Sequence, residues 1–128
     1  MSSKKILIID DEPDVVAYLK VILESNGYEF YSADNIKTAE KLVKEIQPDL
    51  ICLDIVMPKE TGISFYIKIR RDKNLKNIPV MMISGIVEKE KFNFYSYVKD
   101  VSVPPPECYM EKPINVEKYL QRIQELIH

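Results

Sequence analysis

Short apolar runs alternate with helix-like segments along this chain of 128 residues, and this alternation most limits the folds that it can adopt. Runs such as KILIID and DLICLD are apolar at consecutive positions, which indicates strands that are buried on both faces. The segments between the runs carry apolar residues at the spacing of one helix face. Buried strands that alternate with helices predict a parallel sheet with helices on both sides.

We predict five strands and five helices in strict alternation. The strands are expected at Lys5–Asp10, Tyr28–Ser32, Asp49–Asp54, Ile78–Ser84 and Glu107–Met110, and the pattern of the second suits an edge strand. The helices are expected at Pro13–Ser25, Asn35–Gln47, Ile63–Arg71, Val87–Lys99 and after the capping residue Asn115. Right-handed crossovers then give a doubly wound α/β fold, whose ligand site lies beyond the carboxyl ends of the strands. We expect one domain over residues 1–128, with its core at about residues 4–127.

The composition excludes several classes of function. Eighteen basic and twenty acidic residues give a net charge of −2, and the scattered basic residues form no nucleic-acid-binding face. The N-terminal apolar run is too short for a signal peptide and no segment is long enough to cross a membrane, so we expect a cytoplasmic protein without membrane contact. Cys52 and Cys108 are expected to be free thiols in a reducing compartment, and His128 is given no role.

Polar residues stand where four of the predicted strands end. Asp10 and Asp11 follow the first strand, Asp54 ends the third, Ser84 ends the fourth, and Lys112 follows the fifth. Because the carboxyl ends of parallel strands meet at one edge of a sheet, these acids, this hydroxyl and this amine are expected on one rim. Close carboxylates repel one another, so such a cluster favours a cation between them.

Each of these residues also has an ordinary structural interpretation. Asp11 or Glu12 can cap the helix that Pro13 begins, and Glu12 is assigned either to that cap or to the rim. Asp54 can end a strand before a turn, Ser84 can begin a loop, Lys112 can be an exposed lysine, and Tyr109 can be a core aromatic residue. The convergence of these residues on one rim favours the functional interpretation.

The motifs IIDDE, LICLDIVMP, MMISG and YMEKP occur in this order along essentially the whole chain. With them the sequence resembles the response-regulator receiver domain of two-component signalling, a member of the CheY-like superfamily. The resemblance implies a flavodoxin-like (βα)5 three-layer sandwich with strand order 2-1-3-4-5, and no output domain in this chain.

The resemblance also implies the roles of the site residues. Asp54 would be the phospho-acceptor, a carboxylate nucleophile. Asp10, Asp11, Asp54 and the backbone carbonyl of Val56 would form a site for Mg²⁺, with Mn²⁺ as the alternative ion. Asp11 and Asp54 would be direct ligands, and Asp10 would act through a bound water.

The remaining motif residues would serve the phosphoryl group. Lys112 and Ser84 would contact its oxygens, Tyr109 matches the aromatic switch position, and the Lys112–Pro113 bond would be cis. Val56 and Ile86 match the positions that tune the lifetime of the phosphoryl group. Both are apolar and hold no water by hydrogen bonding, which predicts slow self-dephosphorylation.

We therefore expect a phospho-acceptor protein that assists its own phosphorylation and slow dephosphorylation but is not an enzyme. A sensor histidine kinase or phosphotransfer protein would phosphorylate Asp54, and the face of the fourth helix, fifth strand and fifth helix would bind a downstream protein or form a homodimer. One alternative is an aspartate-nucleophile phosphohydrolase, which the apolar Val56 argues against, and another is a receiver-like binding module that takes no phosphate.

Two features depart from the family pattern. The interval from Ser84 to Lys112 is long, and Pro104–Pro106 lie where the family has a turn of small residues. The predicted fourth helix is rich in aromatic residues, namely Phe92, Phe94, Tyr95 and Tyr97. A reshaped core and a non-standard partner surface are both compatible with this composition.

Overall fold

The computed structural model describes residues 3–54, 62–84 and 102–127. Its elements are β1 (Lys5–Ile9), α1 (Pro13–Ser25), β2 (Glu29–Ala33), α2 (Ile36–Ile46), β3 (Leu50–Asp54), α3 (Gly62–Arg71), β4 (Val80–Ser84), β5 (Cys108–Glu111) and α5 (Val116–Ile127). The predicted fourth helix with its four aromatic residues lies outside the described residues, as do Val56 and Ile86. None of the described helices is long and apolar enough to cross a membrane.

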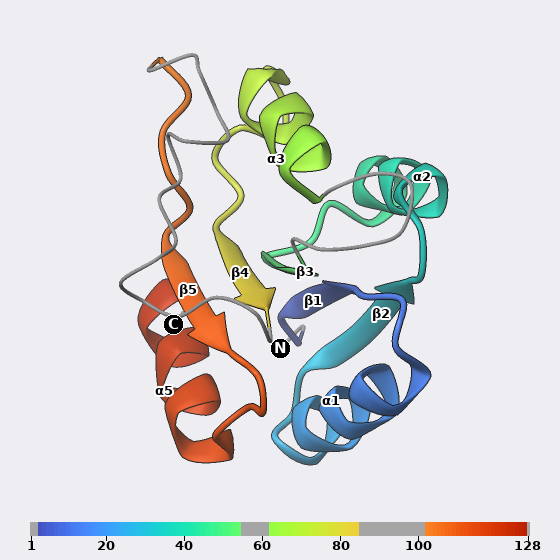
Figure 1. The fold of residues 1–128 in the computed structure, drawn as a ribbon, viewed down its shortest axis with the longest axis vertical. Helices are drawn as coiled ribbons and strands as arrows, with labels where there is room; N and C mark the ends of the chain where they lie inside the picture. The colour runs from blue at the N-terminus through green and yellow to red at the C-terminus, as the bar shows by residue number, and fades with distance from the viewer. Residues whose placement is uncertain (1–2, 55–61, 85–101, 128) are drawn as a thin grey trace.

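The five strands form one parallel sheet in the order β2-β1-β3-β4-β5 (Figure 1). This order confirms the predicted doubly wound fold, and it confirms that β2 is an edge strand. The bounds of α1 are those that were predicted, because Pro13 suits a first helical position and the turn at Gly27 has a φ of 84° that suits glycine. Asn35 and Asn115 cap α2 and α5 by accepting backbone N–H bonds of 2.8 and 3.0 Å.

Alternate residues of the central strands belong to two separate cores. Leu7, Ile9, Ile51 and Leu53 pack with residues of α2 and α3. Ile6, Ile8, Leu50 and Cys52 pack with residues of α1 and α5 on the other face. All eight are almost completely buried, so the consecutive apolar positions of β1 and β3 reflect a sheet covered on both sides.

A buried arginine near the end of α3 joins several segments at the amino ends of β4 and β5. The guanidinium of Arg70 pairs with Glu107 and donates to the carbonyls of Lys76 and Ile78 at 3.1 and 2.7 Å. Its Nε donates to the hydroxyl of Tyr66 at 2.9 Å, and its charge lies 4.8 Å from the centre of the same ring. The side chain is only 3% exposed, so these contacts replace the water that a buried cation would otherwise need.

The proline-rich segment before β5, residues 103–107, contacts the same group of residues around Arg70. The hydroxyl of Tyr66 donates to the carbonyl of Pro104, and Val103 is buried in the core on the side of α2 and α3. Glu107 accepts the backbone N–H of Val80 at 2.8 Å, besides pairing with Arg70. Residues 103–107 therefore connect α3 with the last two strands through these contacts.

Both cysteines are free, as expected from the sequence. Cys52 is fully buried and its Sγ lies 3.4 Å from the hydroxyl of Tyr119 in α5. Burial raises the pKa of the Cys52 thiol to about 12, although the hydrogen bond with Tyr119 acts in the opposite direction. Cys108 in β5 is only partly buried.

Candidate functional site

The register of β1 and β3 brings two of the predicted acids together. Ile8 pairs with Cys52, and two positions further along the chain stand Asp10 and Asp54. Residues two positions apart in a strand share a face of the sheet, so both acids continue the rows that face α1 and α5. They are only 3% and 4% exposed, which makes them, with Arg70, the buried charged residues of the described chain.

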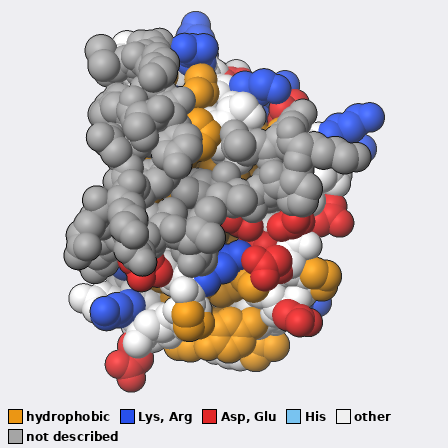
Figure 2. Space-filling view, viewed as in Figure 1, with side chains coloured by type: hydrophobic (Ala, Val, Ile, Leu, Met, Phe, Trp, Pro, Cys, Tyr) orange, Lys and Arg blue, Asp and Glu red, His pale blue; other side chains and the backbone are white. Residues whose placement is uncertain are grey.

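Lys112, which directly follows β5, inserts its ammonium group among these acids. Its Nζ lies 2.9 Å from Asp10, 2.7 Å from Glu12 and 3.4 Å from Asp54. The predicted meeting of acids and an amine at the carboxyl edge of the sheet is therefore present in the structure. Figure 2 draws one face of the molecule, and acidic side chains gather near the middle of that view with basic side chains beside them.

Among the residues that the structure describes, acidic side chains outnumber basic ones at this site. Three carboxylates face one ammonium, and a backbone N–H, that of Glu12, donates to Asp10 at 2.9 Å. Burial disfavours the charged form of Lys112, but hydrogen bonds with Glu12 and Asp10 and the charges of Asp10 and Asp54 outweigh it, so its pKa lies above the usual range. The three carboxylates that gather there make the cluster attractive to a cation.

The structure places the side chain of Glu12, which the sequence left as either a helix cap or a rim residue, at the rim. It occupies the N-cap position of α1, but its side chain makes no capping hydrogen bond. The carboxylate lies at the rim, 58% exposed, and pairs with Lys112. Sequence reasoning left Glu12 as a cap or a rim residue because its partner is 100 positions away.

The donor set fits a divalent cation such as Mg²⁺. Oxygens of Asp10, Glu12 and Asp54 lie within 4.8 Å of one another, the one such group of acids among the described residues. Carboxylate oxygens are the ligands that Mg²⁺ prefers, so the buried pair of Asp10 and Asp54 supplies donors of the right kind. The ammonium of Lys112 now occupies the space between these carboxylates.

Asp11 lies apart from this cluster, although the resemblance pairs it directly with Asp54. It lines an open hollow of about 380 Å³ between the ends of β1 and β2 and the first turns of α1 and α2, together with Asp10, Pro13, Val16, Ser32, Ala33, Asp34 and Thr38. The structure thus brings Asp10, and not Asp11, to Asp54.

The other motif residues lie at or near the same edge. Ser84 ends β4 and pairs in register with Glu111, the residue before Lys112. The Lys112–Pro113 peptide bond is cis. Tyr109 lies in β5 and is 42% exposed, so it is not a core residue in this structure.

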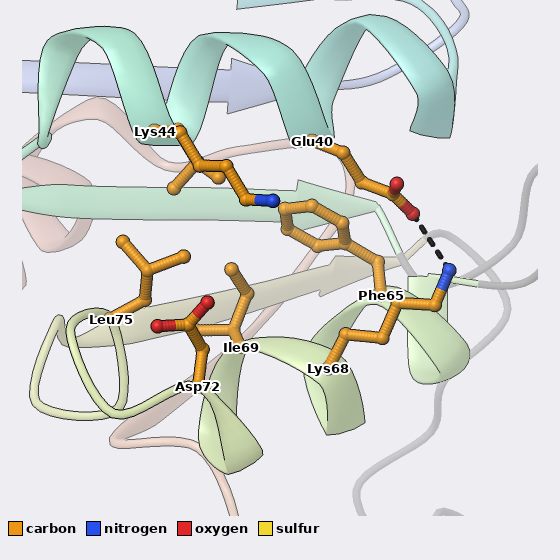
Figure 3. A pocket seen from close by; sticks show the side chains of 8 residues that line it. Glu40, Lys44, Phe65, Lys68, Ile69, Asp72 and Leu75 are labelled. Carbon is orange, nitrogen blue, oxygen red and sulfur yellow. Dashed lines mark hydrogen bonds and ion pairs between the residues drawn. The ribbon is translucent and has the colours of Figure 1, made fainter.

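A second hollow, of about 90 Å³, lies between α2 and α3 and contains none of the predicted site residues. Figure 3 shows Phe65, Ile69 and Leu75 at its centre and the ion pair of Glu40 with Lys68 closing one side. The Glu40–Lys68 distance is 2.8 Å, and both side chains are well exposed. This hollow is a small gap between two helices, on the other face of the sheet from the row that holds Asp10 and Asp54.

Known proteins resemble this chain along most of its length. Residues 6–124 match the response regulator receiver domain family. The chain is 36% identical over 126 residues to the DNA-binding dual master transcriptional regulator RpaA of Synechocystis, covering 96% of this chain and 48% of RpaA. It is 26% identical over 124 residues to the polar-differentiation response regulator DivK of Brucella anthropi, covering 97% of this chain and 96% of DivK. The chain therefore spans about half the length of RpaA.

A solved structure of similar fold is that of the chemotaxis protein CheY4 of Vibrio cholerae. It is 25% identical to this chain, with a TM-score of 0.84 and coverage of 98% of this chain and 99% of CheY4. Because the family match covers nearly the whole chain and the fold agrees with that of a CheY protein over almost its full length, this chain belongs to the response regulator receiver domain family of two-component systems.

Proposed function

We propose that this receiver accepts a phosphoryl group on Asp54 and signals through its outer face. The observation that carries the proposal is the buried carboxylate of Asp54 at the carboxyl edge of the sheet, beside Asp10 and 3.4 Å from the ammonium of Lys112. A nucleophilic oxygen, a second acid for a metal and a cation for phosphoryl charge are the groups that phosphoryl transfer requires.

The proposed reaction transfers the phosphoryl group from a phosphohistidine of a sensor kinase or phosphotransfer protein. A carboxylate oxygen of Asp54 forms the new bond to phosphorus, while the bond from phosphorus to the imidazole nitrogen breaks. The imidazole leaves with the electron pair of that bond and takes a proton from solvent. The product on Asp54 is an acyl phosphate.

Mg²⁺ is the cofactor that this site would hold, with Mn²⁺ as the alternative. Asp10, Asp11, Asp54 and the carbonyl of Val56 are the proposed ligand set, and Asp10 and Asp54 already lie together. The bound ion would neutralise negative charge on the phosphoryl oxygens. Lys112 would hold one of these oxygens by a charge-assisted hydrogen bond, and Ser84 would hold another.

The signal would pass to β5 and its neighbouring helices. In the proposal, Ser84 moves towards the new phosphoryl group and Tyr109, now partly exposed, turns inward. A local change of charge would thereby shift a two-state element of the outer face. A downstream protein, or a second copy of the chain, would bind the face that contains β5 and α5.

The test is to incubate the protein with phosphoramidate and Mg²⁺ and to record the intact mass. We expect one acid-labile phosphoryl group per chain, none in Asp54→Asn, and normal labelling in Asp14→Asn, which removes an exposed acid in the first turn of α1. Repeated consumption of the phosphodonor would instead indicate a phosphohydrolase. A wild-type protein that gains no mass would indicate a binding module that takes no phosphate.

A further inference from the structure

The geometry around Lys112 points to a role for Glu12 that rests on the proposed phosphorylation of Asp54. We infer that Glu12 is a positioning residue: it draws the ammonium of Lys112 towards the rim and away from Asp54, and so weakens the hold of the site on a phosphoryl group. The residue would set how far the receiver favours its unphosphorylated state.

The distances show which acid holds the ammonium most closely. Nζ of Lys112 is 2.7 Å from Glu12, 2.9 Å from Asp10 and 3.4 Å from Asp54. The side chain of Glu12 is 58% exposed, whereas those of Asp10 and Asp54 are 4% and 5% exposed. The shortest contact is therefore made with the acid at the rim, and the longest with the proposed phospho-acceptor.

The backbone fixes Glu12 where its side chain reaches the lysine. Its N–H donates to Asp10 at 2.9 Å, and its carbonyl accepts from Val16 at 3.1 Å in the first turn of α1. Pro13 follows directly and restricts the chain further. Because the side chain caps no helix N–H, its carboxylate is available to Lys112.

A competition between Glu12 and a phosphoryl oxygen follows from the donors of the ammonium. A lysine ammonium has three N–H donors, and three carboxylates already lie around Lys112. A phosphoryl oxygen on Asp54 gains a donor only when one of these contacts is given up. Removal of the Glu12 charge would free Lys112 for the phosphoryl group without changing either buried acid.

The test measures the affinity of the protein for beryllofluoride, an analogue of a phosphoryl group that binds without covalent chemistry. Titrations by calorimetry at saturating Mg²⁺ compare wild type with Glu12→Gln, Lys112→Met and the double variant. We expect Glu12→Gln to bind beryllofluoride roughly two- to fivefold tighter, the range that an exposed ion pair supports. In the Lys112→Met background we expect Glu12→Gln to leave the beryllofluoride affinity unchanged. The four proteins form a double-mutant cycle, which isolates the interaction between Glu12 and Lys112.

A matched control removes a charge without touching Lys112. Asp34→Asn deletes an exposed acid that lines the neighbouring hollow with Asp10 and Asp11, and it should change the affinity less than Glu12→Gln does. Glu12→Asp keeps the charge on a shorter side chain and should fall between wild type and Glu12→Gln. Circular dichroism verifies that each variant is folded.

The outcomes separate this inference from the function on which it rests. The inference is overturned if Glu12→Gln binds beryllofluoride no more tightly than wild type. It is also overturned if Glu12→Gln raises the affinity equally in the Lys112→Met background, because that result would indicate a general effect of charge. If wild type binds no beryllofluoride and gains no mass from phosphoramidate, the proposed function itself fails. If wild type does both and Glu12→Gln behaves like wild type, only the role of Glu12 is lost.

Discussion

The short strand β5 has a cation near each of its ends, and the two cations, the buried Arg70 and the partly buried Lys112, have different surroundings. Before the strand, Arg70 meets Glu107, the Tyr66 ring and hydroxyl, and two backbone carbonyls. After the strand, Lys112 meets the three carboxylates Asp10, Glu12 and Asp54. Among the described residues, Arg70 pairs with one acid, whereas Lys112 pairs with three.

This difference in charge indicates a difference in role. Arg70 pairs with one acid and makes four hydrogen bonds, so its network holds α3, the proline-rich segment and the last strands in one arrangement. The Lys112 cluster gathers three carboxylates, which are oxygen donors that a divalent cation can use. The two ends of β5 thus suggest a structural anchor and a chemical site on the same strand.

The largest expected effect is at the anchor. Arg70→Met should lower the free energy of unfolding by about 3 kcal/mol, because it removes a buried partner and leaves several acceptors without a donor. Urea unfolding followed by circular dichroism measures this loss, and the rate of phosphorylation of the folded variant should stay close to wild type.

Lys68→Met is the control for that experiment. It breaks the Glu40–Lys68 pair, whose side chains are both well exposed, and should cost under about 1 kcal/mol. Equal losses of stability in the two variants would contradict the view that Arg70 is an anchor.

The next largest effect is expected at Lys112, on the rate of phosphorylation. Lys112→Met should slow phosphorylation by a small phosphodonor about 100-fold, because no fixed cation would then neutralise the phosphoryl oxygen in the transition state. Intact-mass time courses at saturating Mg²⁺ measure the rate. A near-normal rate in this variant, or a comparable loss in Arg70→Met, would remove the division of roles between the two ends of β5.

A smaller effect is expected on the lifetime of the phosphoryl group. The resemblance implies that Val56 tunes this lifetime, and its apolar side chain has no group to hydrogen-bond an attacking water, so we expect Val56→Asn to speed the loss of phosphate several-fold. Phosphate release from the purified phosphoprotein measures this lifetime, with urea unfolding as a control for stability. Fast loss of phosphate from the wild type would count against the predicted slow self-dephosphorylation.

The smallest expected effect concerns pH. The pKa of Lys112 is raised from its usual value of 10.5, so the folded protein binds this proton more tightly than the unfolded chain does. The stabilisation is complete below pH 10.5 and is lost as the pH rises through the higher folded value. The free energy of unfolding of wild type should therefore fall more steeply at alkaline pH than that of Lys112→Met. If the free energy of unfolding depended on pH in the same way in wild type and Lys112→Met, this prediction would be contradicted.

The pattern of apolar residues was sufficient to predict most of the fold. The parallel doubly wound sheet, the edge position of β2 and the bounds of α1 follow from alternation, a proline at the first helical position and a glycine turn, whereas the strand order was implied by the family resemblance. The expected rim was also present, because parallel strands all end at the same edge of a sheet. These features depend on local sequence or on a general rule of folds.

The contacts between distant residues were not predictable in the same way. Arg70 was placed on a helix, but its burial depends on Glu107 and on a proline-rich segment whose path no local pattern determines. Glu12 was left as either a helix cap or a rim residue, because its pairing with Lys112 depends on where β5 ends relative to β1. A glutamate beside two aspartates was the one signal in the sequence that pointed to this position.

By itself, the sequence determined the class of fold, the family and the set of residues that reach the site edge. Only the tertiary structure decided which of those residues meet: Asp10 and Asp54 through the register of β1 and β3, and Glu12 through Lys112. The reason is physical. Periodicity fixes which face a side chain takes within one element, whereas contacts a few ångströms long depend on the packing of elements far apart in the chain.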